Sequence, residues 1–197
     1  MNKIIFATGN QGKIREIKQI MADMDVEILS MKEAGIFMDI EENGTTFEEN
    51  ALIKARAIAK EAGALVLADD SGLEIDYLDK APGVLSARYL GEDTSYDVKN
   101  THILGLLKDV KGEDRSARFV CSIAAVFPDG REFTTYATIE GEIAHKIEGE
   151  NGFGYDPIFF VPEFGKTTAQ LSSEEKNKIS HRGKALTMMK EILQKEI

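Results

Sequence analysis

The residues most suited to chemistry gather in four short segments of the chain. These are residues 8–13 (TGNQGK), 68–72 (ADDSG), 152–157 (GFGYDP) and 180–183 (SHRG). Together they offer glycine amides and a lysine for phosphate, and carboxylates for a metal ion and a water molecule. They also offer an aromatic ring for a base, and cationic donors for a base edge or a phosphate. The combination favours a site that hydrolyses a nucleotide.

The first segment is typical of an anion cradle. It joins an apolar strand-like run to residues with helical spacing, so its glycine turn would expose N–H groups at a helix N-terminus. Lys13 adds a full positive charge there. Ile14 replaces the magnesium-binding Ser or Thr of a Walker A loop, and the glycine spacing differs as well. An isolated turn of this kind is usually structural, and only the other segments favour phosphate binding.

The second segment carries two adjacent carboxylates, Asp69 and Asp70, after an apolar strand that we expect to end there. Successive strand side chains point to opposite sides, so one carboxylate should face the site while the other braces its surroundings. Burying both without a partner would be costly, which favours a cation, and magnesium readily accepts carboxylates, waters and phosphates. Glu41 and Glu42 are candidates for a further oxygen ligand. Taken alone, Asp-Asp-Ser-Gly is equally typical of a turn.

The last two segments could contact a base. Phe153 stands between two glycines and could stack on a base, although a core aromatic is the commoner interpretation. Ser180 could cap the final helix, which would place His181 and Arg182 on its first turn with their donors aimed outward. Lys176 lies on a preceding short helical segment. A solvated charged surface is the alternative for these cations.

The elements expected around these segments alternate between strand and helix, which predicts a mixed α/β fold. One of the helices should begin at the capping boxes of residues 45–49 and end at Gly63. We expect strands at 3–8, 64–68, 117–127, 133–139 and 158–161, and helices with apolar stripes at 14–24, 52–62, 103–110 and 186–193. A turn at 128–130 makes the third and fourth strands a hairpin. We predict a single domain over residues 1–197, with a hairpin lobe at roughly 112–148 standing apart.

Composition limits the classes of function. The chain has 197 residues, 43% of them hydrophobic, and a net charge of −10. The negative charge argues against nucleic acid as a partner. The sequence shows neither a signal peptide nor a membrane span, and Cys121 is the lone cysteine, which together predict a cytoplasmic protein. His102 and His145 have no second histidine or cysteine at metal-binding spacing, and we expect neither to be a ligand.

Across nearly its whole length the sequence resembles the inosine triphosphate pyrophosphatase family, also called XTP/dITP diphosphatases, of the Ham1 type. The resemblance is carried by residues 8–13, 46–51 (TFEENA), 68–72, 81–83 (APG), 86–89 (SARY), 152–157 and 179–183 (ISHRG). It implies a two-lobed α/β fold with a long mixed sheet and a cleft between the lobes, and a homodimer. It also implies hydrolysis of ITP, dITP and XTP to the monophosphate and pyrophosphate, with no membrane partner.

The resemblance also implies roles for individual residues. Glu41 and Asp70 would bind Mg²⁺, for which Mn²⁺ could substitute, and Asp70 would accept the proton of the attacking water. The triphosphate would be held by Thr8, Gly9, Asn10, Gln11, Gly12 and Lys13. The remaining substrate contacts would come from Ser71, Phe153, Gly154, Tyr155, Asp156, Lys176, His181 and Arg182.

Two other functions stay open from the residues alone. A nucleotide-binding sensor without catalysis would make the Asp69-Asp70 pair structural. A general metal phosphohydrolase acting on sugar phosphates or ordinary nucleotides would leave the loop of Phe153 without a purpose. Release of pyrophosphate, compared across several nucleotides, separates the three.

Overall fold

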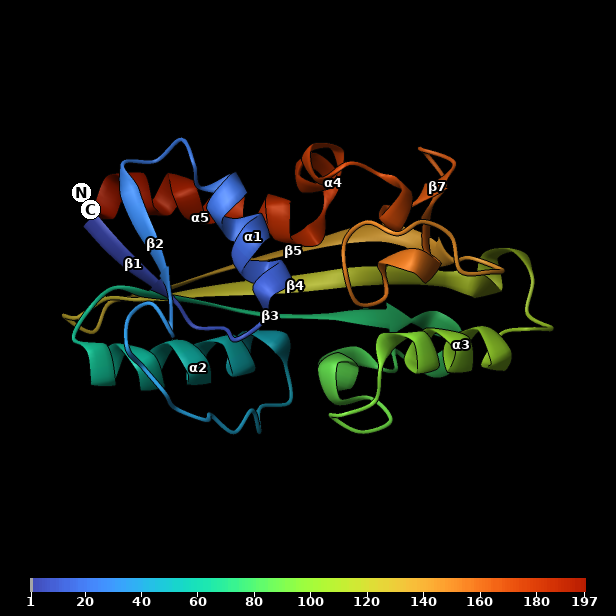
Figure 1. Cartoon of the computed structure of the whole chain (residues 1–197), viewed down its shortest axis with the longest axis horizontal. Helices are drawn as coiled ribbons and strands as arrows, with labels where there is room; N and C mark the ends of the chain where they lie inside the picture. The colour runs from blue at the N-terminus through green and yellow to red at the C-terminus, as the bar shows by residue number, and fades with distance from the viewer. Residues whose placement is uncertain (1) are drawn as a thin grey trace. The chain divides into compact units, whose positions relative to one another are not determined.

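The structure, a computed structural model, describes residues 2–197 (Figure 1). Within them, strands form one sheet in the order β2-β1-β3-β4-β5-β6-β7. The strands are β1 (Asn2–Phe6), β2 (Val26–Ser30), β3 (Val66–Ile75), β4 (Ser116–Val126), β5 (Glu132–Ile143), β6 (Phe159–Val161) and β7 (Lys166–Thr167). The α-helices are α1 (Gln11–Ile20), α2 (Phe47–Ala62), α3 (Tyr96–Leu106), α4 (Ser173–Ile179) and α5 (His181–Glu196). Short 3-10 helices cover Asp76–Leu78, Gly83–Arg88, Gly112–Arg115, Asp156–Ile158 and Thr168–Gln170.

The sheet is mixed, as the resemblance implies. β1 pairs in parallel with β2 and β3, whereas β6 pairs antiparallel with β5 and β7. The chain divides into two compact units. The first contains residues 1–70, 121–137 and 181–197, and the second contains residues 71–120 and 138–180. The β4–β5 hairpin, expected to stand apart as a lobe, is shared between these units.

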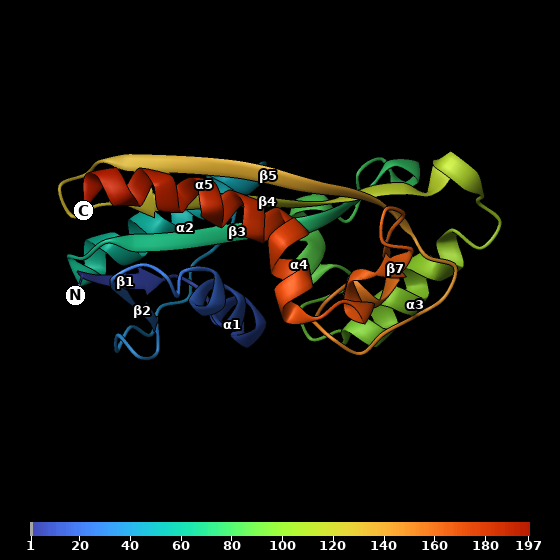
Figure 2. The ribbon, with the colours of Figure 1, turned by 90° about the horizontal axis from the view of Figure 1, so that it is seen from above.

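In the first unit, helices cover both faces of the sheet (Figure 1). α1 and α5 pack on one face in a cluster that includes Phe6 and Leu67. α2 packs on the other face, where Val66 and Ala68 are buried. Figure 2 shows α5 lying along β4 and β5, and Thr135 Oγ1 donates to the carbonyl of Ala185 at 2.9 Å. Alternate residues of β3 therefore face different helices.

The second unit has a core of its own. It includes Ile103 of α3, Phe119 of β4 and Phe159 of β6, and the Phe119 and Phe159 rings lie 4.3 Å apart between centroids. Arg115 is buried and donates to four backbone carbonyls, including that of Leu107 just beyond α3. The bond to Leu107 satisfies a carbonyl that the helix leaves free at its C-terminal end, and two of the others tie the end of β5 to it.

Several local predictions are confirmed. α2 has the expected capping box, in which Thr46 and Glu49 each bond the other's backbone, and it ends at Gly63 in the left-handed conformation with φ of 59°. The short helix that carries Lys176 is α4, and Ser172 caps it. No helix in the described part of the chain is long and apolar enough to cross a membrane.

Two predicted boundaries are the furthest from the structure. The strand expected to stop at residue 68 continues as β3 to Ile75, so Asp69 and Asp70 lie within it. Carboxylates at mid-strand are tolerated because the neighbouring helices supply cations, which the local sequence does not reveal. α3 begins at Tyr96, seven residues before the apolar run that indicated it, because Ser95 caps it by accepting from the Val98 N–H.

Candidate active site

The phosphate cradle expected at residues 8–13 forms the turn between β1 and α1. Asn10 is the N-cap of α1, and its Oδ1 accepts from the N–H groups of Gly12 at 2.9 Å and Lys13 at 3.2 Å. The Asn10 N–H in turn donates to Thr8 Oγ1 at 3.1 Å. Gly9, Asn10 and Gln11 are exposed. The turn is thus organised without a ligand, with a polar surface at a helix N-terminus where an anion is favoured.

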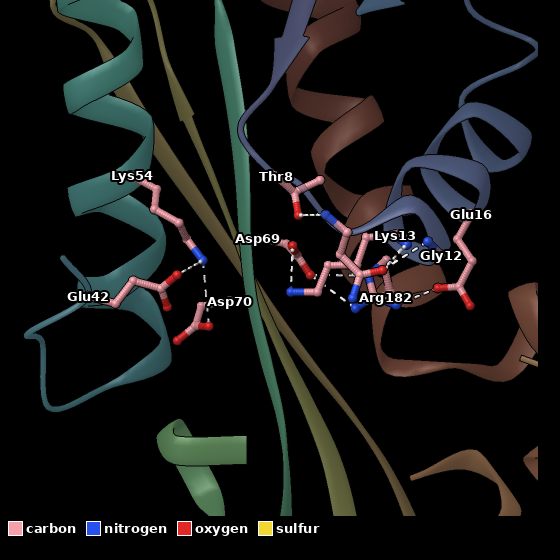
Figure 3. A network of polar contacts seen from close by, with 10 residues as sticks. Thr8, Gly12, Lys13, Glu16, Glu42, Lys54, Asp69, Asp70 and Arg182 are labelled. Carbon is pink, nitrogen blue, oxygen red and sulfur yellow. Dashed lines mark hydrogen bonds and ion pairs between the residues drawn. The ribbon is translucent and has the colours of Figure 1, made fainter. Parts of the chain in front are cut away.

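Asp69 points from β3 toward α1 and α5 (Figure 3). Its Oδ1 lies 3.0 Å from Lys13 Nζ, and its Oδ2 accepts from Arg182 Nε at 3.2 Å and Nη2 at 3.1 Å. Arg182 Nη1 also donates to Glu16. Burial would lower the pKa of Arg182, but the charges of Asp69 and Glu16 outweigh it and raise that pKa. The arginine therefore stays charged in the interior.

Asp70 points the opposite way, toward α2 (Figure 3). Its Oδ1 lies 3.7 Å from Lys54 Nζ, and Lys54 Nζ donates to Glu42 Oε1 at 3.0 Å. Burial raises the pKa of Asp70 to about 6, even though the charges of Lys54 and Lys13 oppose the rise. A carboxylate with this pKa is ionised near neutral pH and is still basic enough to accept a proton.

Asp70 Oδ2 is buried and has no hydrogen-bond partner among the described residues. Such an atom is suited to accept a hydrogen bond from water or to bind a cation. Magnesium is commonly held by one or two carboxylates, with waters and substrate phosphates completing its shell. Glu42 shares Lys54 with Asp70, whereas Glu41 is exposed. Of the two candidates, Glu41 and Glu42, it is Glu42 that is better placed as the second carboxylate.

Asn50 and Lys54, one turn apart on α2, both hold the segment that carries Glu42. Asn50 is fully buried, and its Oδ1 accepts from the Gly44 N–H at 2.8 Å. Sequence reasoning gave no chemical role to either side chain. The sequence shows only that the two lie four positions apart and so share a helix face; their burial, which makes them notable, comes from the structure.

In the second unit, Asp156 organises the loop that carries Phe153. Its Oδ2 accepts from the Phe153 N–H at 2.8 Å and from Lys176 Nζ at 2.7 Å, while its Oδ1 accepts from the Thr168 hydroxyl at 2.7 Å. Lys176 Nζ lies 4.9 Å from the centroid of the Phe153 ring. The loop thus places an aromatic ring and a cationic donor next to each other.

Tyr155 supports this loop from beneath. Its ring is buried edge-on against Tyr96, with the centroids 5.1 Å apart, and its hydroxyl donates to the Ser86 carbonyl at 2.7 Å. Asn100 of α3 donates to the Gly154 carbonyl at 3.1 Å. These contacts fix the backbone of the loop. Tyr155 therefore has a packing role in addition to any contact with a substrate.

The predicted site residues thus fall into two groups, one in each unit. The first unit contains residues 8–13, Glu41, Asp70, His181 and Arg182, and the second contains Ser71, residues 153–156 and Lys176. The expectation that His181 and Arg182 point outward is wrong, because they are 5% and 2% exposed. Asp69 and Glu16 draw the arginine inward.

The fold is mixed α/β, and its first unit combines a polar turn at a helix N-terminus with a buried carboxylate whose pKa is raised, an arrangement suited to an enzyme. The sequence matches the Ham1 family over residues 4–192. A dITP/XTP pyrophosphatase of Clostridium perfringens is 48% identical over 98% of both chains. One from Caldanaerobacter subterraneus is 50% identical over 100% of this chain and 98% of its own.

Solved structures agree. A HAM1 protein from Coxiella burnetii superposes with a TM-score of 0.89 at 42% identity, covering 99% of this chain and 100% of its own. The Ham1 protein of Staphylococcus aureus gives 0.87 at 44% identity, with full coverage of both chains. The chain belongs to the Ham1 family.

Proposed function

We propose that this chain is a nucleoside triphosphate pyrophosphatase that hydrolyses dITP, XTP and ITP to the monophosphate and pyrophosphate, cleansing the nucleotide pool. The observation that carries the proposal is Asp70, a buried carboxylate with a pKa of about 6 and one unpartnered oxygen. The same strand anchors Lys13 of the phosphate cradle through Asp69. The relatives named dITP/XTP pyrophosphatase support the choice of substrate.

Asp70 would accept a proton from the attacking water while the oxygen of that water bonds to the α-phosphorus. The bond between that phosphorus and the oxygen bridging to the β-phosphate then breaks, and pyrophosphate leaves with the bridging oxygen. Lys13 would hold the phosphates at the cradle. Lys54 keeps Asp70 and Glu42 close together despite their like charges.

Asp70 and Glu42 would hold a divalent cation, Mg²⁺ or Mn²⁺. When bound, that ion would offset the charge of the triphosphate and polarise its oxygens. Asp70 Oδ2, which lacks a protein partner, is the oxygen most open to such an ion.

Lys176 and Phe153 would recognise the base. Hypoxanthine and xanthine present a keto oxygen at position 6, where adenine presents an amino group. A lysine can donate a hydrogen bond to the keto oxygen but not to the amino group, so it favours hypoxanthine and xanthine over adenine. Phe153 would stack on the ring. Asp156 holds Lys176 beside Phe153 by pairing with its Nζ at 2.7 Å.

The test is a product assay with ITP, XTP, GTP and ATP in the presence of Mg²⁺. We expect monophosphate and pyrophosphate, formed fastest from ITP and XTP, and no turnover in excess EDTA. Nucleoside diphosphate plus phosphate as products would identify a general phosphohydrolase. Nucleotide binding without any product would identify a sensor. Full turnover in EDTA would remove the metal from the proposal.

We also propose that the enzyme is a cytoplasmic homodimer, as its resemblance to the family implies. Light scattering on the purified protein tests the dimer, and fractionation of cells that produce it tests the compartment.

A further inference from the structure

A group of four charged side chains, three of them buried and Lys13 partly buried, lies in the first unit at the phosphate cradle. It consists of Lys13 and Glu16 on α1, Asp69 on β3 and Arg182 on α5, and we call it the Asp69 cluster. The cluster contains two cations and two carboxylates, so its formal charges cancel. The Asp69 side chain is 0% exposed, and that of Arg182 is 2% exposed.

Asp69 uses its two oxygens differently. Oδ1 faces Lys13 Nζ at 3.0 Å, and Oδ2 accepts two bonds from the Arg182 guanidinium. Lys13 carries its charge on a flexible stem with several rotatable bonds. Its side chain is 16% exposed, compared with 0% for Asp69, so Lys13 lies at the edge of the cluster nearest the solvent while Asp69 holds its ammonium group.

We propose that Asp69 is a positioning residue. Its one carboxylate holds both Lys13 and Arg182, and so fixes the position of the cradle lysine relative to the arginine. This inference rests on the proposed function and adds to it how the cradle is preorganised. Asp69 itself is closed to solvent, so it acts on the substrate only through the cations that it holds. Its neighbour Asp70 belongs to the opposite face of the sheet.

Replacement of Asp69 by asparagine tests whether Asp69 acts by holding both cations or only by filling space. Asparagine has the same shape but only one acceptor oxygen, and its amide nitrogen is a donor. It can accept from Arg182 or from Lys13, and its donor then faces the other cation. The substitution also leaves two cations with only Glu16. Adding Lys13→Met removes one cation and restores the balance.

A double-mutant cycle with Asp69→Asn and Lys13→Met tests the proposal. We expect each single substitution to raise the KM for ITP by about tenfold, with kcat changed by less than about threefold because Asp70 and Lys54 are untouched. The double variant should have a KM within about twofold of Lys13→Met, because the two losses share one interaction. Factors that multiply in the double variant would overturn the proposal.

Asp76→Asn is the matched control. Asp76 is also an aspartate that pairs with two cations, Lys80 and Arg118, but it lies in the second unit and outside the proposed site. We expect it to leave the KM for ITP unchanged. A KM increase equal to that of Asp69→Asn would show a general effect of losing an ion pair and would contradict the proposal.

Stability provides a second measurement, which is needed because Asp69→Asn leaves an unbalanced buried cation. The double variant should melt at a higher temperature than Asp69→Asn alone. If Asp69→Asn does not fold, the double variant should still fold and match Lys13→Met in KM. A double variant that also fails to fold overturns the shared anchor. Wild-type protein that releases no pyrophosphate would refute the proposed function instead, without bearing on the melting comparison.

Discussion

Asp70 shows how burial adjusts one carboxylate. It is 6% exposed, its Oδ1 is 3.7 Å from Lys54 Nζ, and its Oδ2 lacks a hydrogen-bond partner within the described residues. Loss of hydration disfavours the ionised form, and the neighbouring lysines only partly compensate. The resulting basicity suits proton transfer, but it destabilises the fold whenever the carboxylate is charged.

We expect Asp70→Asn to lower kcat for ITP by at least about two orders of magnitude, because the amide keeps the shape but accepts no proton. Steady-state kinetics at saturating Mg²⁺ measure the loss. Asp69→Asn, which acts through Lys13 and Arg182, should retain most of kcat. The opposite ranking of these two variants would exchange the roles of the adjacent aspartates.

The same substitution should stabilise the metal-free protein at neutral pH. The pKa of Asp70 rises from an ordinary value of 3.8 to about 6 in the folded state, so the folded protein binds this proton more tightly than the unfolded chain. That contribution to stability is complete below about pH 4 and is lost as the pH rises through about 6. Asparagine does not ionise, so Asp70→Asn should exceed the wild type above pH 6 by on the order of 3 kcal/mol.

Thermal or urea unfolding in EDTA, repeated from pH 4 to pH 8, tests this expectation. The advantage of Asp70→Asn should shrink toward zero at the acid end. A variant that is less stable than the wild type at pH 8 would mean that the Lys54 contact outweighs burial.

Among the elements, β3 directs its side chains to both faces of the sheet in the first unit. Its even and odd residues face different helices, so two adjacent aspartates reach separate sets of cations. Asp69 lies on the same face of the sheet as Leu67 and points toward α1 and α5. Asp70 lies on the same face as Ala68 and points toward α2. A one-residue shift of the strand would exchange the two carboxylates.

The loop of residues 152–157 depends on glycine at its first position. Gly152 has a φ of 75°, and a Cβ there would collide with the Asp156 carboxylate that holds Phe153 and Lys176. We expect Gly152→Ala to raise the KM for ITP at least about fivefold, by moving those two side chains. It should also cost more than about 1 kcal/mol of unfolding free energy.

Gly130→Ala separates collision from backbone strain. Gly130 also has a positive φ, of 89°, but a Cβ there would meet no atom within 4 Å. This variant should lose about 1 kcal/mol of stability and keep its KM. Equal effects of the two substitutions on KM would show that the Asp156 contact does not organise the base site.

For the whole molecule, each unit has its own core, but β3, β4 and β5 each contribute residues to both units. We expect one unfolding transition, because unfolding either unit alone would interrupt three continuous strands. The chain has no tryptophan, and four of its five tyrosines lie in the second unit. Tyrosine fluorescence therefore reports mainly on the second unit, while circular dichroism reports on both.

The transitions from the two probes should coincide in urea. Ile123→Ala in the first unit and Ile139→Ala in the second should each lower the free energy of unfolding by about 2 to 5 kcal/mol, because both side chains are buried. Each substitution should move the urea midpoints of both probes by the same amount. Separate midpoints for fluorescence and dichroism would show that the units unfold independently.

The sequence by itself determined the parts that depend on neighbours along the chain. The Thr46 capping box, the Gly63 helix end and the alternation along β3 are local, and hydrogen bonds or sterics within a few residues decide them. The four segments also indicated the kind of chemistry, because phosphate, metal and base each need particular side chains.

Only the tertiary structure decided which charges meet. Asp69 and Arg182 are 113 positions apart, and no local pattern places them together. The choice of Glu42 beside Asp70 depends on where Lys54 of α2 reaches. Burial of these groups, which raises the pKa of Asp70 and holds Arg182 inside, is a property of the packed elements. The sequence therefore named the reactive groups, while packing fixed their partners and their charges, because desolvation and ion pairing act only between residues that folding brings together.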